Sequence, residues 1–469
     1  MKPSDGNIKE ILESCQIHEI LGIKGDYWNR FIDRLNWVYH TTDDVWKNSK
    51  YIDIRSFLLK ILIILLGSVL SIIRFGKYRR QLVGADFSKK VIAMPFCGLH
   101  VRFEVLFDLV DDLTMLYPPI FHYEYIEKHI NSFRKKNRKI SLAVFNIKDV
   151  LSVLCICIRH YFRLKKCNHT LNVYYNSNTS QFANAFVISL LYQFYIKRIV
   201  SSINNSSPKI WLFDYDFDFK YIVFNSEIKK YRPNDTTIHV QHGAFYTYVD
   251  YYCNPVSDIS LCCSRREQAI IEEYNKFGKK IMPLGASLQS FSEKPSAFVK
   301  NSPSYDILLL LTDTFHESHL ELQKQILSKL KRSNFKSLVR YRPATKLSDK
   351  TALGAYTTGM VESVETTLAS DISNAKVVVS FSEDAIFECF RQQKKIVFCV
   401  EDKSIYDYSV GKSSNVYIET KESFNVDIIE KCLALPNIDY SDDAFVTYNF
   451  GEFTFERIKS NLNCILNDI

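Results

Sequence analysis

The chain has 469 residues, of which 46% are hydrophobic and 14% aromatic, and its formal net charge is +8. This length exceeds what one hydrophobic core fills, so we expect two domains plus extensions. The apolar content excludes disorder over most of the length. The charge is modest for the size and no RNA- or DNA-binding motif accompanies it, so we expect no nucleic-acid partner.

The cysteines and the N-terminus indicate a reducing compartment. The twelve cysteines are scattered, and the two close pairs, Cys155/Cys157 and Cys262/Cys263, lack the two-pair spacing of a zinc site. The first residues lack the apolar core and cleavage pattern of a secretory signal. We therefore expect a cytoplasmic protein without a metal ion or cofactor.

Residues 1–85 are predicted to form a helical N-terminal extension that contains one strongly apolar segment. Residues 57–73 carry Lys60 as their single charge and run into Arg74 and further cations. The segment is just short of the about 20 residues that a bilayer span needs. It is a helix buried in the protein, a membrane-contact segment whose cations meet anionic headgroups, or a true span.

Residues 86–286 are predicted to form a first Rossmann-like domain. A strand at 90–95, a loop at 96–100 and a helix at 102–112 make one strand-turn-helix unit, in which Gly98 and His100 are candidates to face an acceptor. A helix at 265–277 closes the domain, and residues 287–304, rich in Ser, Lys and Pro, are predicted to be a linker. The further strands are expected at residues 140–145, 171–175, 210–213, 221–224, 237–240 and 259–262.

Residues 305–469 are predicted to form a second Rossmann-like domain. The alternation of apolar strand-like runs with helical stretches favours a parallel sheet covered by helices. Strands are expected at 305–311, 337–341, 377–380 and 395–400, and helices at 318–331 and 384–391. The predicted fold class is α/β, with two parallel sheets that face a common cleft.

His242 is the strongest candidate for chemistry. Gln241, His242 and Gly243 end an apolar strand, and Gly243 lets a ligand approach the backbone closely. An imidazole that titrates near neutrality can take a proton from an attacking hydroxyl. The alternative is a histidine that only hydrogen-bonds its own loop.

These segments resemble a known family. The Gln-His-Gly turn with the strand and helix after it resembles the end of the N-terminal domain in bacterial surface-polysaccharide glycosyltransferases of the GT-B fold. Residues 380–388 are similar to their serine-rich loop and following helix. The resemblance covers roughly residues 90–440. It implies that, as in these enzymes and the related CDP-glycerol glycerophosphotransferases, a nucleotide-linked donor lies between two Rossmann-like domains.

The donor site is predicted at the second of these segments. Backbone N–H groups around Ser380 and Ser382 precede a helix, so they are placed to hold a phosphate, although Ser382 also suits a simple N-cap. By the resemblance, Glu388 binds the nucleotide ribose. Glu383 and Asp384 depart from this pattern, because carboxylates at the helix start oppose an anion.

Positive charge for the donor is expected from Arg340 and Arg342. Strand alternation puts both side chains on one face of the strand. The alternative is a solvated edge strand that happens to carry two arginines. Relatives commonly have a His-Pro pair here, and this chain has Arg342 at the histidine position.

Two further groups of residues have weaker functional interpretations. Asp214, Asp216 and Asp218 resemble a metal-binding DxD motif, but they alternate with aromatic residues, and GT-B enzymes normally need no such metal, so we interpret them as structural. His316 and His319 follow the first strand of the second domain and are secondary candidates for donor contacts.

The resemblance implies a glycosyltransferase that moves a sugar from a CMP- or UDP-linked donor to a lipopolysaccharide, capsule or other surface glycan. His242 would act as base in an inverting displacement, and the enzyme would be peripheral to the inner membrane on its cytoplasmic side. The alternatives are a CDP-polyol phosphotransferase, an enzyme like the UDP-sugar 2-epimerases, and a non-catalytic scaffold in a glycan assembly complex.

Overall fold

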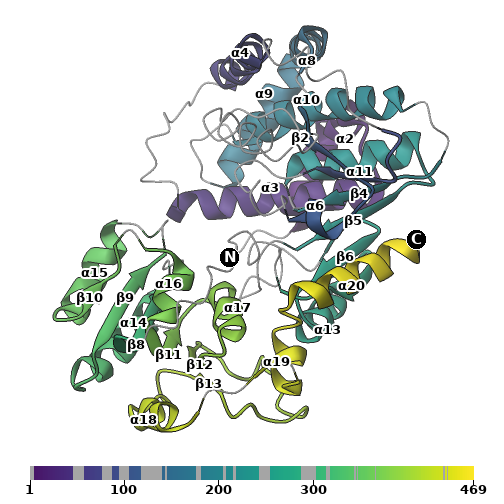
Figure 1. Ribbon diagram of the computed structural model, residues 1–469. Helices are drawn as coiled ribbons and strands as arrows, with labels where there is room; N and C mark the ends of the chain where they lie inside the picture. Colours follow the sequence, from purple (N-terminus) through teal and green to yellow (C-terminus); the bar gives the residue numbers. More distant parts are fainter. Residues whose placement is uncertain are drawn as a thin grey trace.

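The structure, a computed structural model, describes residues 5–45, 57–75, 87–94, 105–117, 140–142, 145–175, 181–203, 207–214, 218–241, 254–286, 303–312, 317–342, 345, 347–364, 366–436, 439–440 and 442–469. The chain builds two parallel β-sheets with helices packed around them (Figure 1). The predicted α/β fold class with two Rossmann-like sheets is confirmed.

The first sheet has seven strands, all parallel, in the order β3-β2-β1-β4-β5-β6-β7. The order reverses between β1 and β4, which is the topological switch point of a doubly wound fold. Along the sheet, Met94 lies opposite Phe213 and Val240 lies opposite Leu261. The strand bounds are β1 Val91–Met94, β2 Leu113–Tyr117, β3 Ile140–Leu142, β4 Ile210–Phe213, β5 Thr236–Val240, β6 Ile259–Cys262 and β7 Lys280–Pro283.

The second sheet has six parallel strands in the order β10-β9-β8-β11-β12-β13. Its central strands, β8 and β11, contain the buried apolar runs 307–311 and 377–379, because a parallel sheet is covered on both faces. The bounds are β8 Tyr305–Leu311, β9 Ser337–Tyr341, β10 Val361–Glu362, β11 Ala375–Ser380, β12 Lys395–Cys399 and β13 Val416–Glu419. The helices between and after these strands are α14 Glu317–Lys331, α15 Leu347–Thr357, α16 Leu368–Ser373, α17 Glu383–Arg391 and α18 Asp427–Ala434.

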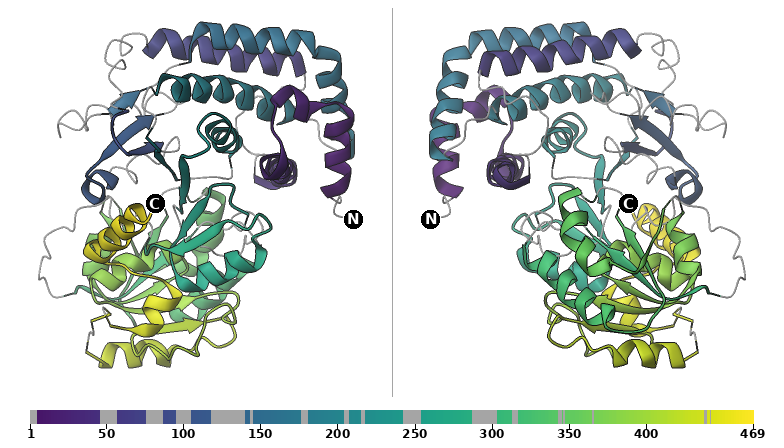
Figure 2. Two further views of the ribbon diagram at one scale, coloured as in Figure 1. Left: turned by 90° about the vertical axis from the view of Figure 1, so that its right-hand side faces the viewer. Right: turned by 90° about the vertical axis from the view of Figure 1, so that its left-hand side faces the viewer.

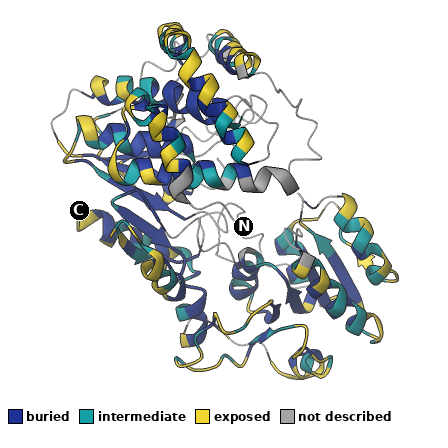
Figure 3. Cartoon of the chain, turned by 180° about the vertical axis from the view of Figure 1, so that it is seen from behind, coloured by how far each residue is buried: buried dark blue, intermediate teal, exposed yellow. Residues whose placement is uncertain are grey.

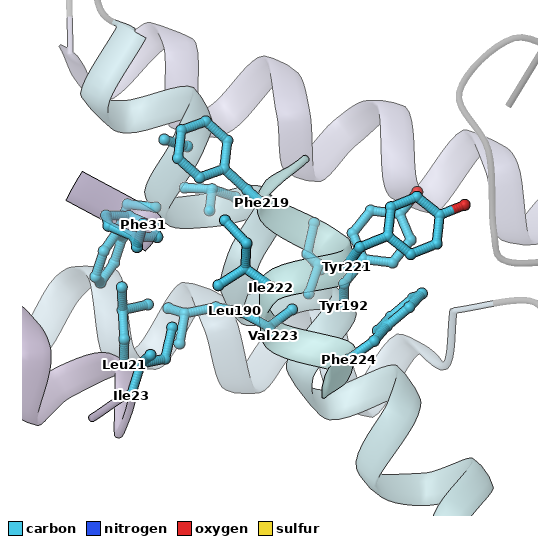
Figure 4. Close-up of a cluster of buried hydrophobic side chains, with 14 of the residues drawn as sticks. Leu21, Ile23, Phe31, Leu190, Tyr192, Phe219, Tyr221, Ile222, Val223 and Phe224 are labelled. Atoms are coloured by element: carbon cyan, nitrogen blue, oxygen red, sulfur yellow. The ribbon is translucent and has the colours of Figure 1, made fainter. Parts of the chain in front are cut away.

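The N-terminal helices pack onto the helices of the first sheet (Figure 2). Their side chains share one hydrophobic cluster with Trp211 and Phe213 of β4, and α11 lies in the middle of that cluster (Figure 4). The bounds are α1 Asp5–Ser14, α2 Ile17–Leu21, α3 Gly25–Val45, α4 Phe57–Phe75, α6 Leu106–Leu109, α8 Ile147–Arg159, α9 Tyr161–Tyr174, α10 Gln181–Ser202 and α11 Phe219–Tyr231.

Two of the predicted strands are wrong. Residues 171–175 lie at the end of α9, and residues 221–224 lie inside α11. Short apolar and aromatic runs fit a buried strand and a buried helix equally well, because periodicity cannot separate them. In α11 the whole run from Phe219 to Asn225 is buried, so no amphipathic pattern marks the helix.

The C-terminus returns to the first sheet. Helix α20 (Phe455–Asn467) contacts α6, and α19 (Ala444–Asn449) packs against α13 (Arg265–Tyr274). Lys90 Nζ donates to the Leu466 carbonyl at 3.2 Å, and Asn461 Nδ2 donates to the Leu284 carbonyl at 3.1 Å. The domain boundaries given above stay a prediction, and most of the predicted linker lies outside the described residues.

The chain segments that run between the two sheets touch at two glycines. Gly285 follows β7 with φ +129°, and Gly451 precedes α20 with φ +91°. A Cβ at Gly451 would lie 1.9 Å from the Cys263 carbonyl oxygen, and a Cβ at Gly285 would lie 2.7 Å from the Glu452 carbonyl oxygen. Both positions therefore require glycine, for backbone conformation and for space.

Candidate functional site

The first candidate segment lies at the carboxyl end of β5. Gln241 is buried there, and its backbone N–H donates to the Leu261 carbonyl at 2.9 Å, so it continues the pairing with β6. His242 and Gly243 come next in the chain but lie outside the described residues, as do Gly98 and His100 after β1. Their places in the site remain predictions.

The second candidate segment is the turn from β11 into α17. The Ser380 hydroxyl donates to the Ser382 carbonyl at 2.9 Å and accepts from the Ser382 backbone N–H at 3.1 Å. Ser380 is fully buried, so its hydroxyl stabilises the turn from the interior of the protein. Ser382 occupies the N-cap position of α17, yet its side chain makes no capping bond. Ser382 thus has the position that the N-cap alternative predicted, without the capping hydrogen bond.

A buried ion pair joins the two sheets at this turn. Arg266 lies at the start of α13, directly after β6, and its Nη2 is 2.6 Å from Oε1 of Glu383, the first residue of α17. Both side chains are at most 4% exposed. The Arg266 guanidinium also stacks over the Tyr406 ring, 4.4 Å from the centroid. Burial lowers the pKa of Arg266, but Glu383, Tyr406 and Glu267 together outweigh burial and the pKa is raised, so the arginine stays charged.

The ion pair removes the effect of one of the two carboxylates, Glu383 and Asp384, that were expected to oppose an anion at the start of α17. The Glu383 carboxylate points to a cation from the other sheet and is neutralised there, so it no longer opposes an anion at the helix start. Sequence reasoning missed Arg266, because nothing in its local pattern separates a buried arginine from its exposed neighbour Arg265.

The ion pair also fixes which edges of the sheets meet. Helices α13 and α17 each begin at the carboxyl end of a parallel strand, β6 and β11. A 2.6 Å contact between the two helix starts therefore places the carboxyl edges of both sheets against each other at this point. In open α/β sheets this edge is where ligands bind.

The expected ribose ligand, Glu388, already has partners on its own helix. Its Oε2 is 2.6 Å from Arg391 Nη2, and its Oε1 accepts from Gln392 at 2.7 Å. The carboxylate is partly exposed and its orientation is fixed by these two bonds. A ribose hydroxyl would have to share the remaining lone pairs of the same oxygens.

The two arginines of β9 differ in their surroundings. Arg340 Nη1 contacts Asp371 Oδ2 at 2.6 Å and donates to the Thr366 carbonyl at 2.9 Å. The same Asp371 oxygens accept from Ser363 and Thr366, so Arg340 belongs to a compact polar network. Arg342, by contrast, is exposed at the carboxyl end of the strand. Asp371 was missed because its partner lies 31 residues away in the chain.

Two of the three aspartates of the DxD-like motif have structural contacts. Asp218 caps α11 by accepting from the Lys220 backbone N–H at 3.1 Å, and Asp214 accepts from the Tyr221 hydroxyl at 3.4 Å. Asp216 and His316 lie outside the described residues, and His319 lies in the first turn of α14. Among the residues that the structure describes, no group of three or more His, Cys, Asp or Glu side chains is placed to hold a metal ion.

Comparisons with known proteins give similarity at the level of fold. No protein-family model matches the sequence. A search of curated proteins finds no significant match. Among solved structures, UDP-GlcNAc 2-epimerase from Methanocaldococcus jannaschii is similar with a TM-score of 0.48 and 9% identity, over 81% of this chain and 99% of that one.

Glycosyltransferases are found among the same structures. S. aureus TarM in complex with UDP is similar with a TM-score of 0.49 and 12% identity, over 81% of this chain and all of that one. The lipopolysaccharide outer core galactosyltransferase WaaB is similar with a TM-score of 0.47 and 12% identity, over 81% and 100% of the two chains. The similar structures thus include both glycosyltransferases and 2-epimerases.

Proposed function

We propose that the chain is a glycosyltransferase that transfers a sugar from a CMP- or UDP-linked donor to a surface glycan such as lipopolysaccharide or capsule. The observation that carries this proposal is the meeting of the two carboxyl edges at Arg266 and Glu383. The pair brings the end of β6, which Gln241 contacts directly after β5, close to the turn at Ser380 and Ser382. In this proposal a donor and an acceptor hydroxyl are held between these two edges while water is excluded.

The residues take separate roles in this proposal. His242, with Gln241 and Gly243 beside it, removes the proton from the acceptor hydroxyl, whose oxygen then attacks the anomeric carbon with inversion. Gly98 and His100 line the acceptor side. The following groups hold the donor: backbone N–H groups around the Ser380–Ser382 turn at the start of α17, the Arg342 guanidinium with Arg340 behind it, and the Glu388 carboxylate on the ribose.

The acceptor in this proposal is carried by the cytoplasmic face of the inner membrane, and the protein binds there peripherally through residues 57–73. Within the part of the chain that the structure describes, no helix combines the length and apolar character that crossing a bilayer requires. Helix α4 is apolar and carries only Lys60 and Arg74 as charges, which fits contact from one side.

Nucleotide binding tests the donor half of the proposal. Thermal unfolding of the full chain is measured with CMP, CDP, UDP and GDP, each at increasing concentration. A nucleotide at 100 times its Kd should stabilise the protein by about 2.7 kcal/mol. We expect CMP or UDP to raise the unfolding temperature most. A largest effect with CDP would favour the polyol-phosphate transferase, and no effect with any nucleotide would contradict the proposal.

Incubation with UDP-GlcNAc alone tests the reaction class. A transferase leaves the sugar at C2 unchanged and releases UDP only slowly without an acceptor. Inversion at C2 in the absence of an acceptor would identify an epimerase instead. Product analysis by NMR separates the two results.

A further inference from the structure

Helix α4 exposes one complete apolar face. Ile61, Ile64, Leu65 and Ser68 are buried against the neighbouring helices α8 and α10. The opposite face is solvent-exposed and consists of large aliphatic side chains, with Leu66 59% and Ile73 69% exposed. The members of this exposed face are Leu58, Leu59, Leu62, Ile63, Leu66, Leu70 and Ile73. A helix that is apolar all round requires an apolar environment on both sides.

The adjacent helix α8 extends this apolar surface. Ile147, Leu151 and Ile158 recur at helical spacing and are exposed, and Phe162 in the first turn of α9 is 84% exposed. Helices α4 and α8 lie side by side at the end of the molecule that is farthest from the second sheet (Figures 1 and 2). Exposed residues run along these outermost helices (Figure 3). We call the exposed residues of α4 and α8, with Phe162, the α4–α8 surface.

The helices of this region are strongly cationic. Helices α4, α8 and α9 carry seven Lys and Arg residues and one Asp, a net charge of +6 out of +8 for the whole chain. The single acid, Asp149, forms an ion pair with Arg198 of α10. Lys148, Arg159 and Arg163 are exposed beside the apolar side chains. An apolar face with a cationic rim complements an anionic lipid surface.

We propose that the α4–α8 surface is a two-helix docking site for anionic phospholipid, with both helices lying in the plane of the bilayer interface. The inference deepens the proposed function, because it rests on an acceptor that is carried by a membrane. Helix α4 shares its buried face with the folded first domain, so it enters the bilayer only to the depth of its outer face, about 5–10 Å. A second copy of the chain fits this surface poorly, because it would place a net +6 opposite another net +6.

Vesicle co-sedimentation tests the proposal without any donor or acceptor. The full chain is mixed with vesicles of phosphatidylcholine alone or with about one third phosphatidylglycerol. We expect binding to the anionic vesicles that falls at high salt, because surface charges are screened. The double variant Leu66→Asp/Leu70→Asp and the double variant Arg159→Glu/Arg163→Glu should each lower the bound fraction at least about tenfold.

Matched controls use exposed residues in the part of the chain that forms the second sheet. Leu347→Asp on α15, at a side chain that is 79% exposed, and Lys412→Glu/Lys431→Glu should leave vesicle binding unchanged. Equal losses in these controls, or equal binding of all variants, would overturn the inference. A further result would also overturn the inference. If Leu66→Asp/Leu70→Asp changed the monomer–dimer state in light scattering but not vesicle binding, the surface would bind a second copy of the chain.

The vesicle-binding result can be distinguished from a failure of the proposed transferase function. Nucleotide-induced stabilisation of the α4–α8 variants should equal that of the parent chain, because α4 and α8 lie away from the β11–α17 turn (Figure 1). Loss of vesicle binding with intact nucleotide binding supports the docking role. Nucleotide binding without any vesicle binding would refute the inference and leave the transferase proposal in place.

Discussion

Arg266 and Glu383 form a buried 2.6 Å ion pair that links the first turn of α13 to the first residue of α17 and so connects the two sheets. The pair lies where a donor phosphate is expected, and it removes the charge of one carboxylate from that position. A buried pair of this kind contributes little net stability when intact but costs much when one partner is removed.

Arg266→Met should therefore destabilise the protein by about 3–5 kcal/mol, because Glu383 would be left buried without a counter-charge. Urea unfolding monitored by circular dichroism measures the loss. The double variant Arg266→Met/Glu383→Leu should recover most of it, since an apolar pair of similar volume avoids the desolvation of both charges. Equal instability of the single and double variants would show that the ion pair is not the cause.

Gly451→Ala should prevent normal folding or cost several kcal/mol. The added Cβ would lie 1.9 Å from a backbone carbonyl, which cannot move aside as a side chain can. Gly359→Ala is the matched control, because Gly359 has nearly the same φ of +90° but open space around it. We expect it to cost only the backbone strain, about 1–2 kcal/mol. Similar losses in both variants would contradict the steric argument.

Arg340 and Arg342 should behave differently when each is changed to Ala. Arg340→Ala should lower the unfolding free energy by about 1.5–3 kcal/mol, because it breaks charged hydrogen bonds to buried Asp371. Arg342→Ala should leave stability within about 0.5 kcal/mol and weaken nucleotide binding about tenfold. Urea unfolding and nucleotide titration of both variants check this. Unchanged nucleotide affinity in Arg342→Ala would remove that residue from the donor site.

His242→Ala should lower the transfer rate by about 10² to 10⁴, the usual contribution of general base catalysis. Nucleotide-induced stabilisation should be unchanged, since the imidazole acts on the acceptor. The control is His169→Ala, at an exposed position on α9. Full transferase activity in His242→Ala would exclude the base role and favour the scaffold alternative.

The sequence predicted most of the second sheet because its strands are long, apolar and separated by clear helices. The strands 305–311, 337–341 and 395–400 agree with β8, β9 and β12 to within a residue. The elements of the first sheet were harder to predict from the sequence. Residues 221–224 were predicted as strand because α11 is buried almost all round, which erases the helical pattern. The short strand β2 was missed, although Asp112 and Pro118 lie directly next to it, because the preceding residues were assigned to one helix over 102–112.

The candidate site was predictable only where a local motif marks it. The turn at Ser380 and Ser382 stands out because an apolar strand runs directly into a helix. Arg266 and Asp371 could not be found in the same way, because each acquires its role from a partner that is distant in the chain. Such pairings are created by the packing of one element on another, and no spacing in a single sequence encodes them.

The close contact of Gly285 with the segment at Gly451 and Glu452 limits how the two halves of the protein can move. The chain passes from the first sheet to the second and comes back, and these two passages touch backbone to backbone. Moving the halves apart along a line would break these backbone contacts. A rotation about this point would keep them, so we expect any opening of the two halves to turn about the Gly285–Gly451 contact.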